Sequence, residues 1–576
     1  MTAKKSVSIS IAGAGGAGAM TAGDILLQAA GKSGWYGIMN RSVGPQIRGG
    51  EAAALLRLAN HPVECMSDGF DLLIAIDWKN ANRFAAEMPL KPTGLVIADP
   101  SAGEVPDAIT AYGAEVVEVE IKKLAKAIPG GRENMISAGL AAGFIGLSED
   151  YLMEIISAKL ARKGEEAVEA SRLCLEAGMK AAANIARNFE IGAADMKNKG
   201  RWLITGNEAV GLGAIRGGVR YAAAYPITPA TEILEWLSPA LAKIGGALVQ
   251  AEDELSSINM AIGASYGGRP SITATSGPGL SLMMEALGLA AAAEVPVVVV
   301  DVMRCGPSTG IATKSEQSDL NIAVYGFHGD APHVVCAPLS VADCLYTGQW
   351  AVHLAEAMQV PVIVLSDQSL GQANVLMKRP VNLSFLANRK VYKEQSEEPY
   401  MRYTITADGV SPMAIPGTPG GQYTADGLTH SVRGTPSTQR SDQEDQMDKR
   451  NRKVVDFDYG IHWGQVSGDG KKTVILTWGS MTAPAKEAIR TLKSEGVDVK
   501  LVAMRLISPF PKDDLLDALK GAKRTLIVEQ THAGQFHSYL RANCDLPGEL
   551  RQFHRPGPHL ISASEITSQI RDWVKS

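Results

Sequence analysis

The segment Val295-Pro-Val-Val-Val-Val300 continues through Asp-Val-Met into Arg304-Cys-Gly-Pro-Ser-Thr-Gly310. Its first part is a run of β-branched residues, which predicts a central strand buried on both faces of a sheet. Its second part is rich in glycine and hydroxyl side chains. Because ligands of open α/β sheets bind beyond the carboxyl ends of the strands, this order predicts both the fold class and the edge of the sheet that carries a site.

Apolar runs and helical stretches alternate along most of the chain. This alternation predicts an α/β protein with several mostly parallel sheets flanked by helices. Trp202–Thr205 is expected to be the first strand of a second domain. A polar, aperiodic region rich in proline and glycine is expected to form a surface excursion without a core of its own. The predicted divisions are a first domain at 1–192, a second at 198–385, the excursion at 386–469 and a last compact domain at 470–576.

The charge balance and the cysteines limit the possible classes of function. The 576 residues include 56 Lys and Arg against 61 Asp and Glu, a formal charge of −5, so no global attraction to nucleic acid or to an anionic membrane is expected. The most apolar window, Ala286–Met303, contains Glu294 and Asp301, which argues against a membrane span. The six cysteines form no C-x-x-C pair. Their dispersion argues against a cysteine-ligated cluster in this chain and favours a reducing cytoplasm.

A glycine-rich segment, Gly13-Ala-Gly-Gly-Ala-Gly18, follows the first predicted strand. Gly13, Gly15 and Gly18 satisfy G-x-G-x-x-G, whose backbone N–H groups can bind a phosphate at a helix N-terminus. A nicotinamide dinucleotide site would also need an acidic residue about 20 positions further on, and none stands there. Two interpretations remain, a site for another phosphate-bearing ligand and a merely tight turn. Arg48 is a second candidate anion contact, or equally a solvated loop arginine.

Four segments of the second domain each follow a predicted strand. Taken singly, they are explained by a proline-fixed turn, by acidic residues at a helix start, and by glycine-rich strand-to-helix loops. They become specific as an ordered set. The segments are Tyr225-Pro-Ile-Thr-Pro-Ala-Thr-Glu232, Gln250-Ala-Glu-Asp-Glu-Leu255, Ala274-Thr-Ser-Gly-Pro-Gly279, and Arg304-Cys-Gly-Pro-Ser-Thr-Gly310 with its continuation Thr313-Lys-Ser-Glu-Gln-Ser-Asp-Leu320.

In this order the four segments resemble the α subunit of 2-oxoacid:ferredoxin oxidoreductases, most closely the 2-oxoglutarate type. The segment Gly13–Gly18 and Arg48-Gly-Gly50 resemble that family's γ subunit, fused ahead of α, although Ala17 replaces a common Gln. Arg505-Leu-Ile-Ser-Pro-Phe-Pro511 resembles the landmark of a transketolase C-terminal-type domain. The resemblance covers nearly the whole chain. It implies a γ-type first domain and a pyrimidine-type thiamine diphosphate domain at 198–385.

The resemblance also implies a cofactor and residues that hold it. Such enzymes use thiamine diphosphate to decarboxylate a 2-oxoacid and form an acyl-CoA, with CoA as co-substrate. A carboxyl group hydrogen-bonded to the aminopyrimidine N1′ favours the tautomer that removes the C2 proton. By position Glu254 matches this carboxyl group, while Glu252 and Asp253 are expected to be helix-start residues. The turn of Tyr225, Pro226, Ile227 and Thr228 is expected to contact the cofactor.

The substrate brings carboxylates and a keto oxygen. Arg304 carries a permanent, forked positive charge that suits such an anion. Thr228, Ser308 and Thr309 can donate hydroxyl hydrogen bonds to it. Catalytic roles are therefore expected for Glu254, Arg304 and Thr228. His328 is either a neighbour of the pocket or a structural histidine.

Two elements of the family are absent from this chain. Gly468-Asp-Gly470 resembles the start of the thiamine metal motif, but no Asn follows before Asn543, so a turn is expected there. No residue is expected to bind a metal. The resemblance places Mg²⁺ and a [4Fe-4S] cluster on a β subunit, with ferredoxin as electron acceptor. It implies a chain that is active only with this β subunit, in a dimer of αβ heterodimers, with no nucleic acid or membrane partner.

Alternatives remain at two levels. Within the class, the substrate could be pyruvate or a branched-chain 2-oxoacid instead of 2-oxoglutarate. From another class, the chain could be a non-catalytic CoA- or nucleotide-binding scaffold, although Glu254, Arg304 and the Tyr225–Thr228 turn are all present. A stand-alone NAD dehydrogenase is disfavoured because the ribose-binding acid is missing.

Overall fold

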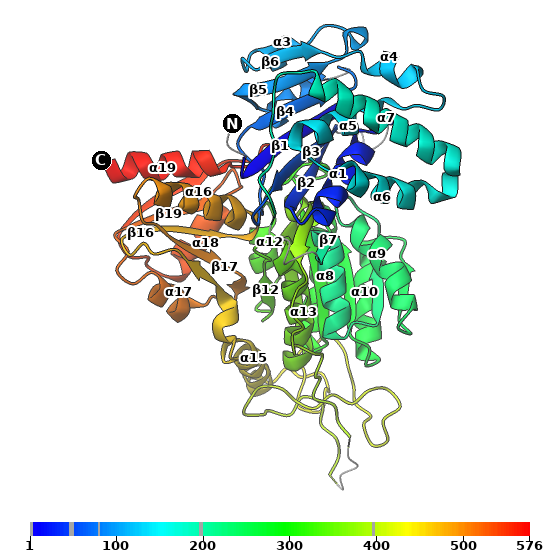
Figure 1. Cartoon of the computed structure of the whole chain (residues 1–576). Coiled ribbons are helices and arrows are strands. Elements are labelled where there is room, and N and C mark those ends of the chain that lie inside the picture. Colours follow the sequence, from blue (N-terminus) through cyan, green and yellow to red (C-terminus); the bar gives the residue numbers. More distant parts are fainter. Residues whose placement is uncertain (1–3, 45–50, 79–80, 195–199, 394–397, 576) are drawn as a thin grey trace. The chain divides into compact units, whose positions relative to one another are not determined.

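The computed structural model describes residues 4–44, 51–78, 81–194, 200–393 and 398–575 (Figure 1). The chain divides into two compact units. One holds Met1–Thr205 with Gln372–Val381, and the other holds Gly206–Gly371 with Asn382–Ser576. Among the helices of the described ranges, none is both long and apolar enough to cross a membrane.

The first unit is built on an eight-stranded sheet with the order β6-β5-β4-β1-β3-β2-β14-β7. Helices cover both faces, and each face has its own apolar core. The strands are β1 (Ser6–Ala14), β2 (Tyr36–Val43), β3 (Glu51–Ala59), β4 (Phe70–Ala75), β5 (Leu90–Ala98), β6 (Glu115–Glu118), β7 (Arg201–Thr205) and β14 (Asn374–Lys378). The helices are α1 (Ala19–Lys32), α2 (Ala81–Phe84), α3 (Asp107–Thr110), α4 (Ile121–Lys126), α5 (Glu133–Ile145), α6 (Glu149–Leu160) and α7 (Glu165–Ala183).

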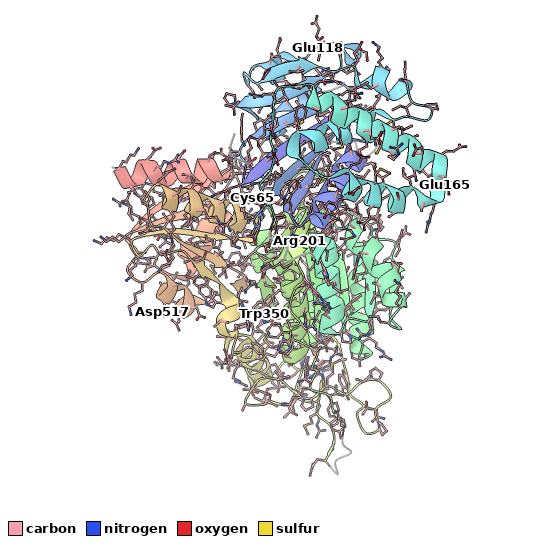
Figure 2. The ribbon with its side chains drawn as sticks, in the orientation of Figure 1. Cys65, Glu118, Glu165, Arg201, Trp350 and Asp517 are labelled. Carbon is pink, nitrogen blue, oxygen red and sulfur yellow. The ribbon has the colours of Figure 1, made fainter. Side chains whose placement is uncertain are left out.

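This sheet is parallel on one side only. β1, β4, β5 and β6 run parallel, whereas β1, β3, β2, β14 and β7 pair antiparallel in succession. The expectation that Trp202–Thr205 opens the second domain was therefore wrong, because these residues lie in β7 and pair with β14. Arg201, labelled in Figure 2, fixes this edge: its guanidinium stacks 3.4 Å above the Tyr36 ring, and its Nε donates to Gly34 O at 3.2 Å.

The second unit contains a seven-stranded sheet with the order β18-β12-β13-β11-β10-β8-β9. All neighbours are parallel except β12 and β18. The strands are β8 (Tyr221–Ala224), β9 (Ala247–Gln250), β10 (Ser271–Thr275), β11 (Val297–Met303), β12 (Val334–Cys336), β13 (Pro361–Asp367) and β18 (Leu506–Ser508). The helices are α8 (Gly206–Gly217), α9 (Thr231–Ala242), α10 (Glu254–Tyr266), α11 (Gly277–Ala292), α12 (Leu320–Tyr325), α13 (Val341–Met358) and α14 (Gln368–Gly371).

The valine-rich segment forms the central strand that the sequence predicted. β11 is buried along its whole length and pairs with β10 on one side and β13 on the other. Residues with β-branched side chains pack well on both faces of such a strand. α13 covers this sheet and carries the buried Trp350, labelled in Figure 2.

The carboxyl-terminal part of this unit forms a five-stranded sheet with the order β15-β17-β16-β19-β20. α16 and α19 pack side by side over it (Figure 1). Its strands are β15 (Gly464–Ser467), β16 (Thr473–Trp478), β17 (Lys500–Met504), β19 (Arg524–Glu529) and β20 (Glu549–His554). Its helices are α16 (Thr482–Ser494), α17 (Lys512–Ala518), α18 (Gln535–Asn543) and α19 (Ala563–Lys575).

The segment predicted as a surface excursion, residues 386–469, is irregular in its first part, but its second part contains a helix. A sixteen-residue helix, α15 (Arg440–Val455), occupies the most highly charged part of the sequence. The expectation of an aperiodic surface segment was wrong there, because Lys449 and Lys453 of α15 point inward. Their ammonium groups contact Glu294 at 2.7 and 2.8 Å, and all three side chains are almost completely buried.

Candidate functional site

The parallel register brings the four strand-end segments of the second unit together. β8 and β9 pair with Ala224 beside Gln250, and β10 and β11 pair with Thr275 beside Asp301. The segments that follow Ala224, Gln250, Thr275 and Met303 therefore leave the sheet at the same edge. This is the edge at which open α/β sheets bind ligands.

The Tyr225–Thr228 turn is closed by its own backbone. Ile227 O accepts the amides of Ala230 and Thr231 at 2.8 and 3.0 Å, at the start of α9. Tyr225 is 39% exposed, so its ring lies at the surface. The carbonyl oxygen of Thr228 accepts a hydrogen bond from Arg304 Nη1 at 2.6 Å. The turn after β8 is thus joined to the arginine after β11.

Glu254 is the first residue of α10, and it is only 7% exposed. Asp253 is the N-cap, because its carboxylate accepts the Ser256 amide at 2.7 Å, as the sequence predicted. A Cβ at Gly279 would lie 2.7 Å from Glu254 Oε1 and 2.1 Å from Thr275 Oγ1. Only glycine fits at position 279, and it leaves the Glu254 carboxyl group at the strand ends of β9 and β10.

Arg304 lies directly after β11 and is also 7% exposed. Burial lowers the pKa of its guanidinium, while the carboxylates of Asp319, Asp301 and Glu254 oppose this shift. Its Nε is buried and has no hydrogen-bond partner among the described residues. The buried Ser276 Oγ at the end of β10 likewise lacks a partner within the described ranges. Polar atoms left without protein partners at a strand-end edge indicate a place where a ligand completes the hydrogen bonding.

The loop after Arg304 turns back sharply. Gly310 has a φ of 50°, and a Cβ there would lie 1.6 Å from Cys305 O, so no other residue fits. Ser308 also adopts a positive φ, 57°. Ser308 and Thr309 are both exposed, so their hydroxyl groups are free to face solvent or a ligand. They follow Arg304 on the same loop, and they take no part in the hydrogen bond that joins Arg304 to Thr228.

His328 does not join the other candidates. It is exposed, and its ring lies beside Gly288 of α11. Gly288 is eleven residues beyond Gly277, the first residue of α11. At 1.5 Å per residue this places His328 about 16 Å from the strand-end edge, outside the site.

The sequence interpretation missed two carboxylates that the structure places beside Arg304. Asp301 is fully buried in the second half of β11. Asp319 comes directly before α12, with its oxygens 2.7 Å from the position of a Cβ on Gly277. Burial and the neighbouring Asp319 raise the pKa of Asp301 well above its ordinary value. An acidic residue inside a valine-rich strand was the signal that could have identified Asp301.

The candidate phosphate loop lies in the first unit, between β1 and α1. Gly15 and Gly16 are exposed at its tip, and Gly18 caps α1 with a φ of 86°. Asp77 accepts the Ala14 amide at 2.8 Å, which places a carboxylate at the base of the loop. Arg48 lies outside the described residues.

The Gly468–Gly470 segment forms a loop between β15 and β16, as predicted, and Asp469 pairs with Lys493. Within the described ranges, no group of three or more His, Cys, Asp or Glu side chains is arranged to hold a metal ion.

Three family models match the chain. The thiamine-diphosphate-binding model of pyruvate flavodoxin/ferredoxin oxidoreductases matches residues 212–450. The pyruvate ferredoxin/flavodoxin oxidoreductase model matches residues 8–181, and the transketolase C-terminal domain model matches residues 463–542.

Individual relatives extend this result over the full length. The chain is 29% identical to the 2-oxoacid:ferredoxin oxidoreductase subunit alpha of Saccharolobus solfataricus, over 93% of each protein. It is 35% identical to the 2-oxoglutarate synthase subunit KorA of Methanocaldococcus jannaschii, over 63% of this chain and 96% of that protein.

A solved structure agrees with both relatives. The 2-oxoglutarate:ferredoxin oxidoreductase from Magnetococcus marinus, with 2-oxoglutarate, coenzyme A and succinyl-CoA bound, matches with a TM-score of 0.92 at 35% identity, covering 99% of each chain. These matches confirm the fold class and the resemblance predicted from the sequence. The chain therefore belongs to the 2-oxoacid:ferredoxin oxidoreductase family.

Proposed function

We propose that this chain is the α-type subunit of an enzyme that interconverts 2-oxoglutarate, CoA and oxidised ferredoxin with succinyl-CoA, CO₂ and reduced ferredoxin. The observation that carries the proposal is the convergence of Glu254, Arg304 and the Thr228 turn at one edge of the seven-stranded sheet. The bound molecules named for the Magnetococcus marinus structure support 2-oxoglutarate as the substrate.

The residues at this edge fit thiamine diphosphate. The Glu254 carboxyl group is held beside Gly279, and the buried Arg304 Nε and Ser276 Oγ lack protein partners among the described residues. When bound, the cofactor would supply an electron sink for loss of CO₂ from a 2-oxoacid. Glu254 would hydrogen-bond its aminopyrimidine ring, with Tyr225, Pro226, Ile227 and Thr228 forming the adjoining wall.

The chain's own residues would orient the substrate and hold its charge. Arg304 donates one N–H to Thr228 O, which fixes the plane of its guanidinium while other N–H groups can bind a carboxylate. Ser308 and Thr309 on the following loop would add hydroxyl donors. Because Glu254 is buried, its carboxyl group can hydrogen-bond the cofactor with little competition from water.

We place the partner subunit on the surface around Glu254, next to the strand-end edge. β9 is the last strand of the sheet and is largely exposed. Apolar side chains that are more than a third exposed lie on the elements around Glu254, as expected for a surface covered by another protein. They are Tyr225, Val249, Leu255, Met260 and Leu282. The relatives are named as alpha subunits, which supports a β partner here. That partner would bring Mg²⁺ and the [4Fe-4S] cluster, in a dimer of αβ heterodimers.

CoA is proposed to use the first unit. The exposed Gly15 and Gly16, with Gly13 and Gly18, form a loop at the start of α1 that can receive a phosphate. The Ala14 amide already donates its hydrogen bond to Asp77, so a phosphate would bind at the tip of the loop, away from this carboxylate. All six cysteines are free thiols, which supports the reducing cytoplasm as the location of the complex.

The test is CoA-dependent viologen reduction by the chain co-purified with its partner. Parallel assays offer 2-oxoglutarate, pyruvate and 2-oxoisovalerate. We expect reduction with 2-oxoglutarate to exceed the other two by at least about tenfold, since a pocket built for a second carboxylate leaves its donors unpaired with the others. Preference for another 2-oxoacid would correct the substrate, and no reduction by a complex loaded with thiamine diphosphate and an intact cluster would contradict the proposal.

Replacing Arg304 by lysine tests the anion contact. Lysine keeps a positive charge but loses the planar fork that binds Thr228 O and a carboxylate together. We expect kcat/KM for the 2-oxoacid to fall by roughly ten- to a hundredfold, the equivalent of one hydrogen bond between charged groups. The control is Arg269→Lys at an exposed position, which should leave kcat/KM unchanged. Equal kinetics in both variants would remove Arg304 from the substrate site.

A further inference from the structure

The loop that carries Arg304 folds back on its own backbone. We call residues 304–318 the arginine loop. The Cys305 amide donates to Lys314 O at 3.0 Å, and Ser318 Oγ donates to Arg304 O at 2.8 Å. On its amino side Arg304 follows directly from the buried strand β11. The backbone of Arg304 is therefore held on one side by the seven-stranded sheet and on the other by the returning half of its own loop.

Gln317 joins this returning half to the five-stranded sheet. It belongs to the segment Thr313–Leu320, and none of its surface is exposed. Its Nε2 donates to Trp478 O at 3.0 Å, its Oε1 accepts the Gln530 amide at 2.8 Å, and its own amide donates to Gln530 O at 2.9 Å. Trp478 is the last residue of β16, and Gln530 directly follows β19. The carboxyl ends of two strands of the second sheet thus hold the arginine loop.

Gln530 makes a further contact with the loop through the segment 555–559. Its Nε2 lies 2.9 to 3.1 Å from three backbone carbonyl oxygens of that segment. Gly557 in this segment packs against the base of the arginine loop, because a Cβ on it would lie 2.4 Å from Cys305 Sγ and 2.6 Å from Ser315 O. The backbone of Gln530 therefore binds one end of the loop, and its side chain shapes the segment that packs against the other.

Gln535, the first residue of α18, binds the chain where the arginine loop ends. Its Nε2 donates to Ser318 O at 2.9 Å, and its Oε1 accepts the Asn321 amide at 3.0 Å. Gln535 is half-buried, so its replacement leaves no cavity in a core. Both atoms of its side-chain amide are used on the arginine loop and on the start of α12.

We propose that Gln317, Gln530 and Gln535 are positioning residues of the 2-oxoacid site, which hold the arginine loop closed from the five-stranded sheet. None of the three touches the substrate, and the proposal rests on the proposed function of the loop. Ser308 on this loop has a φ of 57°, and a residue other than glycine keeps such a conformation only where its surroundings impose it. The three glutamines supply that support.

Two methionine variants remove these contacts without shortening the side chain much. We expect Gln317→Met to raise KM for the 2-oxoacid roughly ten- to a hundredfold and Gln535→Met roughly three- to tenfold, while KM for CoA changes by less than about twofold. The first effect is larger because Trp478 O and the Gln530 amide lose their partner inside the protein. A merely structural role would lower the amount of folded enzyme, which reduces kcat and leaves both KM values unchanged.

Hydrogen exchange of the assembled complex tests the anchoring without any turnover. The Cys305 and Ile311 amides bond across the arginine loop, and they should exchange at least about tenfold faster in both variants. Amides in the middle of β11 should exchange as in the wild type. The matched control is Gln552→Met, the same chemical change at an exposed position of β20, which should keep the wild-type exchange and kinetics.

The outcomes separate this proposal from the proposed function. Unchanged exchange of the Cys305 and Ile311 amides overturns the anchoring whatever the enzyme does, and so does a loss of kcat at constant KM. Should Gln317→Met fail to assemble with the partner, the comparison of Gln535→Met with Gln552→Met decides. If the wild-type complex reduces no 2-oxoacid while the loop amides respond as expected, the anchoring stands and only the proposed function fails.

Discussion

Glu254→Gln is expected to lower 2-oxoacid-dependent viologen reduction by about 10²- to 10⁴-fold, the range associated with loss of one positioned acid–base group. The substitution keeps the size of the side chain and its place beside Gly279, but it replaces the carboxyl group by an amide, which cannot act as an acid or a base. Folding should be unaffected because Glu254 is not the cap of α10; Asp253 is. The measurement is kcat with saturating CoA, together with the thiamine diphosphate content of the purified complex.

The sequence provides a matched control for this experiment. Glu252→Gln makes the same chemical change two residues away, at an exposed position. It should leave kcat and cofactor content unchanged. Near-normal turnover by the Glu254→Gln complex would remove the central assignment, whereas loss of the partner subunit would show that the variant disturbs assembly instead of chemistry.

The convergence of the candidate residues was easier to predict from the sequence than the strand pairing in the eight-stranded sheet of the first unit. Glu254, Arg304 and Thr228 stand in ordered segments after strands, and parallel strands bring such segments to one edge without further information. By contrast, the strand pattern of Trp202–Thr205 shows that it is buried but not which strand it pairs with. Its partner, β14, lies about 170 residues further along the chain. Pairing at that separation leaves no local signal.

Buried charged residues were the second feature that the sequence did not predict. Composition and periodicity assign a charged residue to the surface by default, because most charged residues are there. Asp301, Lys449 and Lys453 all break this rule, and the two lysines do so because their partner, Glu294, is on a distant segment. The sequence shows that Glu294 and Asp301 interrupt an apolar window, but only the structure shows what pairs with them.

The Glu294 cluster explains why the charged excursion folds against the thiamine-type domain. Glu294 stands at the end of α11, where it accepts from Lys449 Nζ and Lys453 Nζ, and Arg402 donates to its backbone carbonyl at 2.8 Å. Burial alone would raise the pKa of Glu294, but the two ammonium groups hold it below its usual range. Burial lowers the pKa of both lysines to about 8. One carboxylate thus offsets part of the positive charge of three buried cations, Lys449, Lys453 and Arg402.

Glu294→Gln should therefore destabilise the packing of α15 by about 3–5 kcal/mol, the cost of leaving buried charges without their partner. The measurement is the opening free energy of α15 amides, from hydrogen exchange under native conditions. Glu285→Gln, at an exposed position on the same helix, is the control and should change it by no more than about 0.5 kcal/mol. Lys449→Met should cost less than Glu294→Gln, because it leaves one carboxylate with two cations.

The loss of opening free energy in Glu294→Gln should depend on pH. Without the carboxylate, the pKa of Lys449 and Lys453 should fall further below about 8, so the native variant gives up protons that the unfolded chain keeps. The free-energy cost of keeping these lysines unprotonated in the native state grows as the pH is lowered. The opening free energy of Glu294→Gln should therefore fall further below the wild-type value near pH 6 than near pH 8. In the double variant Glu294→Gln/Lys449→Met one of the unneutralised cations is gone, so its opening free energy should exceed that of Glu294→Gln alone. A deficit that is independent of pH and unrelieved in the double variant would mean that packing, and not charge, attaches the excursion.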